Sequence, residues 1–250
     1  MVVIAVTGKG GTGKTVVAAL LVKYISEKTS KILAVDADPD SNLPDALGVE
    51  VEKTLGDVRE LFQVTRDTLV DKESWLEGKI FEIIHEFDRY DLLVMGRPEG
   101  EGCYCFVNNL LRGILKKFMR HYDYVIVDCE AGLEHFSRKT MEGADYIIIV
   151  TDTSKKGLKT AKKIKELVRE LNLNFREIFL VGNKIASEEA KKVIKDFAGK
   201  EGFILLELLP YDEKIVELDL RGEPIVNLPD GSEFARKVRF IADVLTGWGS

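Results

Sequence analysis

The amino-acid sequence predicts an α/β fold with three layers, in which a mostly parallel central sheet is flanked by helices. Short apolar runs rich in Val and Ile alternate with longer amphipathic segments, the order typical of strands joined by helical crossovers. The first apolar run, at 2–6, leads through a glycine-rich loop into an Ala/Leu-rich helix at 16–26. No linker or repeat separates a second unit, so we expect one domain over residues 1–250.

Composition limits the class of protein. The 250 residues can bury a large core, and no apolar run approaches the length of a membrane span. The N-terminus has the pattern of a strand and not of a cleavable leader, so we expect a cytoplasmic protein. The net charge of −6 argues against nucleic-acid binding, which normally needs a basic surface. Three cysteines, Cys103, Cys105 and Cys129, are too few for a secreted disulfide framework and indicate metal or redox chemistry.

The first loop has the pattern of a phosphate-binding P-loop, G-x-x-x-x-G-K-[ST]. Its glycines let backbone N–H groups point at phosphate oxygens, and the helix that follows adds the positive end of its dipole. We expect Lys14 to reach the β- and γ-phosphates of ATP or ADP and the Thr15 hydroxyl to bind Mg²⁺. The alternative is a glycine-rich turn of an ordinary α/β protein. The predicted nucleotide contacts in this loop are Gly8, Lys9, Gly10, Gly11, Thr12, Gly13, Lys14 and Thr15.

A second lysine, Lys9, stands inside the loop just before Gly10. This arrangement resembles the deviant Walker A group, which includes MinD and ParA partitioning ATPases, the nitrogenase iron protein and metal-insertion ATPases. In that group the early lysine reaches across a face-to-face dimer to the partner's nucleotide. The resemblance implies a homodimer and catalytic roles for Lys9 and Lys14. The alternative is that Lys9 is an exposed, solvated side chain.

A second buried strand, at 31–36, runs into an acidic segment with Asp36, Asp38 and Asp40. Carboxylates at the carboxyl end of a strand lie where open α/β sheets bind ligands. In the deviant Walker A group an aspartate at the position of Asp38 lies at the γ-phosphate and positions the attacking water, so the resemblance implies a catalytic Asp38. Asp36 and Asp40 are weaker candidates. The alternative is a turn whose Asp and Asn side chains cap the next helix.

Residues 50–90 are polar and mixed in charge, with short helices predicted near 55–62 and 74–76. A strand at 91–95 then leads to Cys103 and Cys105, which project to the same side if the backbone is extended. Two thiolates are too few for a closed zinc site, but a two-fold dimer would supply four. A tetrahedral S₄ site suits Zn²⁺ or an iron–sulfur cluster, and square-planar sites suit Ni²⁺. The alternative is a pair of small buried hydrophobic residues.

Residues 95–105, Met-Gly-Arg-Pro-Glu-Gly-Glu-Gly-Cys-Tyr-Cys, resemble the CooC-type ATPases. That family matures the nickel-containing active site of carbon monoxide dehydrogenase, and the resemblance covers essentially the whole chain. It implies ATP-dependent dimerisation in which Cys103 and Cys105 of both subunits hold Ni²⁺ or Zn²⁺ at the interface. It also implies apo carbon monoxide dehydrogenase as the partner.

The strand at 124–128 ends in Asp128, a Walker B pattern, and Asp128 is expected to organise Mg²⁺ and its waters. The segment that follows is close to the Asp-x-Glu-Ala-Gly-Leu-Glu-His of CooC-type proteins, and its glycine permits movement when the γ-phosphate leaves. Cys129 is interpreted as a packing residue, with a role as third thiolate left open.

The last third of the chain supplies the expected base contacts. After a basic helix at 155–171, interpreted as a solvated face, a strand at 177–182 leads to Asn183 and a later strand to Pro210. In relatives these positions contact the adenine edge and pack along the adenine. The helix at 234–242 invites comparison with the membrane-seeking helix of MinD, but we expect it to dock on the sheet without stable membrane insertion.

Two rival functions stay open at this point. One is a partitioning or positioning ATPase, which uses its dimer as a binding switch and needs no metal. The other is an electron-transfer ATPase like the nitrogenase iron protein, whose second cysteine falls a few residues after the Walker B acid. This chain has Leu133, Glu134 and His135 there, which argues against a cluster.

Overall fold

The computed structural model describes residues 1–97, 105–130, 144–170 and 174–247. Its centre is an eight-stranded sheet with the order β3-β4-β2-β5-β1-β6-β7-β8. Every pairing is parallel except that of β3 with β4. The mostly parallel α/β fold predicted from the sequence is therefore confirmed. The strands are β1 (Val2–Gly8), β2 (Ile32–Ala37), β3 (Ile84–Glu86), β4 (Asp91–Val94), β5 (Tyr124–Cys129), β6 (Tyr146–Thr151), β7 (Glu177–Ile185) and β8 (Ile204–Pro210).

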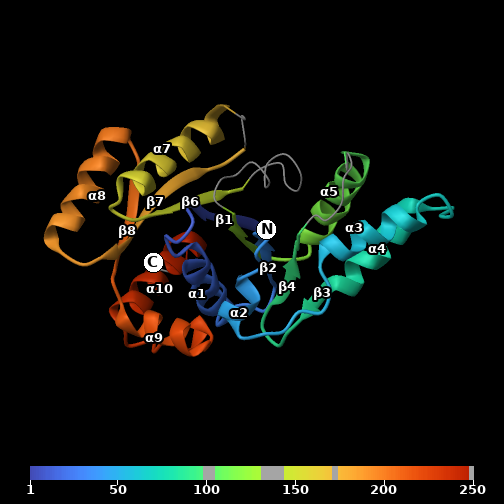
Figure 1. Cartoon of the computed structure of the whole chain (residues 1–250), viewed down its shortest axis with the longest axis horizontal. Coiled ribbons are helices and arrows are strands. Elements are labelled where there is room, and N and C mark those ends of the chain that lie inside the picture. Colours follow the sequence, from blue (N-terminus) through green and yellow to red (C-terminus); the bar gives the residue numbers. More distant parts are fainter. Residues whose placement is uncertain (98–104, 131–143, 171–173, 248–250) are drawn as a thin grey trace.

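Helices cover both faces of the sheet (Figure 1). The strands are apolar on both sides, so alternate residues such as Val3 and Ile4 belong to two separate cores. One core receives side chains from α3, α4, α5, α7 and α8, and the other from α1, α2 and α10. The helices are α1 (Lys14–Ser26), α2 (Leu43–Leu47), α3 (Leu55–Thr65), α4 (Lys72–Ile83), α5 (Cys105–Met119), α7 (Lys155–Glu170), α8 (Glu188–Glu201), α9 (Glu213–Arg221) and α10 (Glu233–Thr246).

Strand register brings the predicted site residues to one edge of the sheet. β1 lies between β5 and β6, with Val6 opposite Asp128, and β2 pairs with β5 so that Asp36 also lies opposite Asp128. Because these strands are parallel, their carboxyl ends and the loops that follow them all lie at the same edge.

The region at 50–90 differs most from the sequence-based expectation, because α3 and α4 are longer than the predicted segments. Both helices begin at strong N-caps. Thr54 and Asp57 form a capping box, and the Asp71 carboxylate accepts hydrogen bonds from two backbone N–H groups of α4. The sequence analysis also missed β3, a three-residue edge strand that is defined by its pairing with β4.

Strand β7 extends past its predicted end at Gly182 and includes Asn183 and Lys184. Its pairing with β8 shifts register between Gly182 and Ile185, and Lys184 has a φ of 59° there. The irregularity turns the end of β7 toward the P-loop, which a periodic apolar pattern does not reveal.

The C-terminal helix docks on the protein, as expected. α10 buries an apolar stripe that includes Phe234, Val238 and Ile241, and it packs against α1 and β8. The Arg239 guanidinium lies 4.2 Å from the ring centroid of Tyr24 in α1 and forms an ion pair with Glu27. Within the described ranges, no helix has both the length and the apolar character needed to cross a membrane.

Leu20 and Leu220 provide a matched test of this packing. The Leu20 side chain is fully buried in α1, whereas Leu220 in α9 is 81% exposed. We expect Leu20→Ala to lower the free energy of unfolding by about 2–5 kcal/mol, because it leaves a cavity. Leu220→Ala should change it by less than about 0.5 kcal/mol. Urea denaturation of both variants measures this, and equal effects would contradict the described packing.

Candidate nucleotide-binding site

The loop between β1 and α1 has a conformation that requires glycine at two positions. A Cβ atom at Gly8 would lie 2.1 Å from the carbonyl oxygen of Val150 in β6, so any side chain there would clash. Gly13 has a φ of 90° in the left-handed region that disfavours other residues. Within the loop, the backbone N–H and the hydroxyl of Thr12 both donate to the carbonyl of Lys9, at 3.2 and 2.7 Å. The loop therefore has the curled backbone predicted from its sequence.

Strand β7 contacts this loop through Asn183 and Lys184. The Asn183 side-chain amide nitrogen donates to the carbonyl of Thr12 at 2.7 Å, and the Lys184 ammonium donates to the carbonyl of Gly11 at 2.8 Å. The side-chain oxygen of Asn183 accepts from the backbone N–H of Lys184 at 2.7 Å. Asn183 is thus buried and bonded within the protein, and its predicted contact with adenine stays a prediction.

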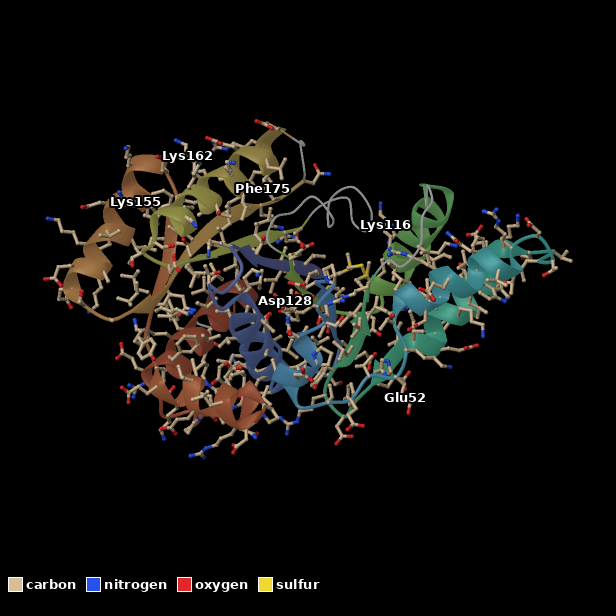
Figure 2. The ribbon with its side chains drawn as sticks, viewed as in Figure 1. Glu52, Lys116, Asp128, Lys155, Lys162 and Phe175 are labelled. Atoms are coloured by element: carbon tan, nitrogen blue, oxygen red, sulfur yellow. The ribbon has the colours of Figure 1, made fainter. Side chains whose placement is uncertain are left out.

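Thr15 and Asp128 lie together at the start of α1. The Thr15 hydroxyl donates to one oxygen of the Asp128 carboxylate at 2.6 Å. The other oxygen of Asp128 is buried and has no hydrogen-bond partner in the described part of the chain. Burial raises the pKa of Asp128 to about 7, which the Thr15 hydrogen bond partly opposes. Figure 2 shows Asp128 near the centre of the molecule. Hydroxyl and carboxylate oxygens with an unfilled position fit the preferences of Mg²⁺.

Asp36 organises the acidic segment after β2. Its two carboxylate oxygens accept hydrogen bonds from the backbone N–H groups of Asp38, at 3.0 Å, and of Leu43, at 2.9 Å. Burial raises the pKa of Asp36 to about 6, although both hydrogen bonds oppose the shift. Asp38 is partly exposed and accepts a hydrogen bond from the backbone N–H of Asp40 at 3.0 Å. The sequence analysis gave a helix-capping turn as the alternative for this segment but did not assign that role to Asp36, which an Asp-x-Asp turn at a strand end could have indicated.

A pocket of about 870 Å³ adjoins the loop, a volume within the usual range for small-molecule sites. Lys14, Thr15 and Asn183 are among the residues that line it. Pro210 and Ile215 supply apolar surface, so the predicted adenine neighbour Pro210 lies in the wall of this pocket. Lysine and hydroxyl groups suit the phosphates of a nucleotide, and apolar side chains suit its base.

The remaining predicted site residues are placed as follows. Among the described residues, the Lys9 ammonium makes a single hydrogen bond, at 3.2 Å to the adjacent carbonyl of Gly10. Cys129 is fully buried, and burial raises the pKa of its thiol well above the usual value, as expected for a packing residue. Cys103 lies outside the described residues. Cys105 begins α5, but its side chain is outside them as well. Over the described ranges, no group of three or more His, Cys, Asp or Glu side chains could hold a metal ion.

The end of β4 is joined to the acidic segment, a connection that the sequence analysis missed. The backbone N–H of Met95 donates to the carbonyl of Asp36 at 2.8 Å, and the Arg97 guanidinium pairs with Asp40 at 2.9 Å. The segment that leads toward the cysteine pair therefore contacts the loop beside the nucleotide pocket.

Comparison with known proteins places the chain in a family. Residues 3–225 match the CobQ/CobB/MinD/ParA nucleotide binding domain. The uncharacterised ATP-binding protein MJ0685 of Methanocaldococcus jannaschii is 52% identical over 96% of this chain and 97% of its own length. The carbon monoxide dehydrogenase accessory protein CooC of Rhodospirillum rubrum is 34% identical over 88% of this chain and 87% of its own length.

Solved structures agree with this placement. The septum site-determining protein MinD of Pyrococcus horikoshii, solved with Mg-ADP, has a TM-score of 0.73 and 26% identity. The match covers 100% of this chain and 97% of the Pyrococcus horikoshii chain. MinD of Aquifex aeolicus matches with a TM-score of 0.74 over 98% of this chain and 96% of its own, and at 23% identity it supports the fold alone. The chain therefore belongs to the CobQ/CobB/MinD/ParA family and is a P-loop ATPase with ATP or ADP and Mg²⁺ as its ligands.

Proposed function

We propose that this ATPase is a metallochaperone that delivers nickel to apo carbon monoxide dehydrogenase. The observation that carries the proposal is the pair Cys103 and Cys105 in the glycine-rich segment after β4. The similarity to the accessory protein CooC, whose printed name refers to that enzyme, supports the same client. All of these roles would fall within one ATPase domain over residues 1–250.

The nucleotide roles follow from the geometry of the P-loop. Lys14, at the buried start of α1, would neutralise the β- and γ-phosphates, and the loop N–H groups would bind their oxygens. Thr15 and Asp128 would hold Mg²⁺, which when bound neutralises charge between the β- and γ-phosphates. Asp38 would position the attacking water, because it extends from the turn that Asp36 organises.

Two subunits would complete both sites. Within the described residues Lys9 makes one hydrogen bond, to its own loop, so its ammonium would be available to reach the phosphates of a partner's nucleotide. Cys103 and Cys105 of two subunits would supply four thiolates, a set that can bind Ni²⁺ or Zn²⁺. We therefore propose a homodimer that closes with ATP bound and releases its metal after hydrolysis.

The contacts between β4 and the acidic segment support coupling between the two sites. Asp36, near the end of β2, and Asp40, in the loop expected to respond to the γ-phosphate, bind Met95 and Arg97, which precede the cysteine pair. A change in that loop would therefore reach the segment that carries the thiolates.

The second candidate is a partitioning or positioning ATPase. It is favoured by the likeness to MinD and ParA structures, including the ParA family ATPase of Chlorobium tepidum, with a TM-score of 0.72. In this function the nucleotide-dependent dimer acts as a binding switch and needs no metal.

Lys14→Ala tests the nucleotide site. Loss of the ammonium should weaken MgADP binding by at least roughly a hundredfold, because several charge-assisted hydrogen bonds to phosphate are lost. Titration calorimetry measures the dissociation constant, and circular dichroism checks the fold. Retained affinity would contradict the P-loop assignment.

Asp128→Asn tests the proposed role of β5 in Mg²⁺ binding. The amide cannot supply a carboxylate charge, so Mg²⁺-dependent ATP hydrolysis should fall roughly tenfold to a hundredfold. The concentration of Mg²⁺ needed for half-maximal activity should rise. An unchanged Mg²⁺ dependence would remove Asp128 from the metal site.

The decisive measurement for the proposed function is the metal stoichiometry under anaerobic conditions. We expect about one Ni²⁺ or Zn²⁺ per two chains, with binding abolished in the Cys103→Ala/Cys105→Ala double variant. Cys129→Ala is the matched control, and it should bind metal like the wild type because that thiol is buried. No tight binding in the wild type would favour the partitioning-type switch.

A further inference from the structure

Lys184 adopts a backbone conformation that its side chain disfavours. In the described residues, Ser41 and Lys184 are the two that have positive φ without being glycine, and Lys184 has a φ of 59°. Left-handed geometry is unfavourable for residues with a Cβ atom, and it persists where surrounding contacts determine it, often at functional sites. Here the position is the irregular end of β7, in the wall of the nucleotide pocket.

This conformation directs the Lys184 side chain to the P-loop. Its ammonium donates to the carbonyl of Gly11 at 2.8 Å, while the neighbouring Asn183 donates to the carbonyl of Thr12 at 2.7 Å. Two consecutive peptide groups of the loop are thus held from the β7 side. The backbone N–H of Lys184 in turn donates to the Asn183 side chain at 2.7 Å, so the two residues support one another.

Holding these carbonyls also orients the N–H groups of the loop. In a planar trans peptide, the C=O of one residue and the N–H of the next point in opposite directions. With the Gly11 carbonyl held by Lys184, the Thr12 N–H points to the carbonyl of Lys9, at 3.2 Å. With the Thr12 carbonyl held by Asn183, the Gly13 N–H is directed away from β7. The curl that presents donors to phosphate oxygens is therefore set before a nucleotide binds.

We propose that Lys184 is a positioning residue for nucleoside di- and triphosphates. Its ammonium stabilises the phosphate-binding conformation of the P-loop through the Gly11 carbonyl, and it takes no part in the chemical step. Lys184 therefore increases the affinity for the nucleotide, because without its hydrogen bond to Gly11 the nucleotide itself must order the loop. This role concerns ATP binding and is independent of the proposed metal cargo.

The test compares Lys184→Ala, Lys184→Gly and Lys184→Arg. The alanine and glycine variants should bind MgADP roughly tenfold more weakly, the order of one charge-assisted hydrogen bond. The KM for ATP should rise by a similar factor, with kcat changed less than twofold. Lys184→Arg should retain most of the affinity, because its guanidinium can still donate to the Gly11 carbonyl.

Thermal melting separates this role from a purely structural one. Lys184→Gly should melt at a higher temperature than Lys184→Ala, because glycine accepts the positive φ, and yet both should lose affinity. Lys195→Met is the matched control, since it removes one exposed positive charge in α8, outside the nucleotide pocket. It should leave MgADP binding unchanged.

Three results would overturn the proposal. Wild-type affinity in Lys184→Gly would mean that only the backbone conformation matters. Equal falls in kcat and kcat/KM would mean that Lys184 acts in the transition state. If Lys195→Met weakened MgADP binding as much as Lys184→Ala, the effect would come from the loss of one positive charge in general and not from the contact of Lys184 with the P-loop.

Discussion

Two buried carboxylates, Asp36 and Asp128, lie opposite each other at the carboxyl ends of β2 and β5, and the rest of the site depends on how they are neutralised. Burial raises the pKa of each, and the charge of Asp36 adds to the shift at Asp128. Burying two negatively charged carboxylates close together is energetically unfavourable unless hydrogen bonds or cations compensate their charge. Asp36 uses its oxygens to hold the loop that follows β2, whereas one oxygen of Asp128 has no hydrogen-bond partner among the described residues. In the proposed Mg²⁺ site this oxygen would be available to a cation, and the nearby Lys14 lowers the pKa of Asp128.

At the same edge of the sheet, the end of β4, which leads toward the cysteine pair, contacts Asp36 and the loop after β2. The ion pair between Arg97 and Asp40 is exposed and contributes at most about 1 kcal/mol. The hydrogen bond from Met95 to the carbonyl of Asp36 is the stronger link, because it joins buried backbone at the ends of β4 and β2. The proposed coupling by this route would therefore depend on main-chain movement more than on surface charge.

Much of the fold could be predicted because strands buried on both faces leave a strong signal in the sequence. Continuous Val and Ile runs identified β1, β2, β5 and β6, and the P-loop located the edge at which ligands bind. The prediction was weakest over 50–90, where polar helices are stabilised by caps and by packing on the core. The strand β3 could not be predicted from its own three residues, because its backbone becomes a strand only by pairing with β4.

The sequence by itself determined the class of fold and the P-loop, and it predicted the catalytic set, since the spacing of the P-loop and the acids at strand ends indicate which groups would face phosphate and metal. Only the tertiary structure decided what Asn183, Lys184 and Asp36 do. Their partners are backbone carbonyls and N–H groups, and a backbone group has no signature in the sequence. The physical reason is that these contacts depend on register, on an irregular strand end and on a positive φ, all of which arise when β7, β8 and the P-loop pack together.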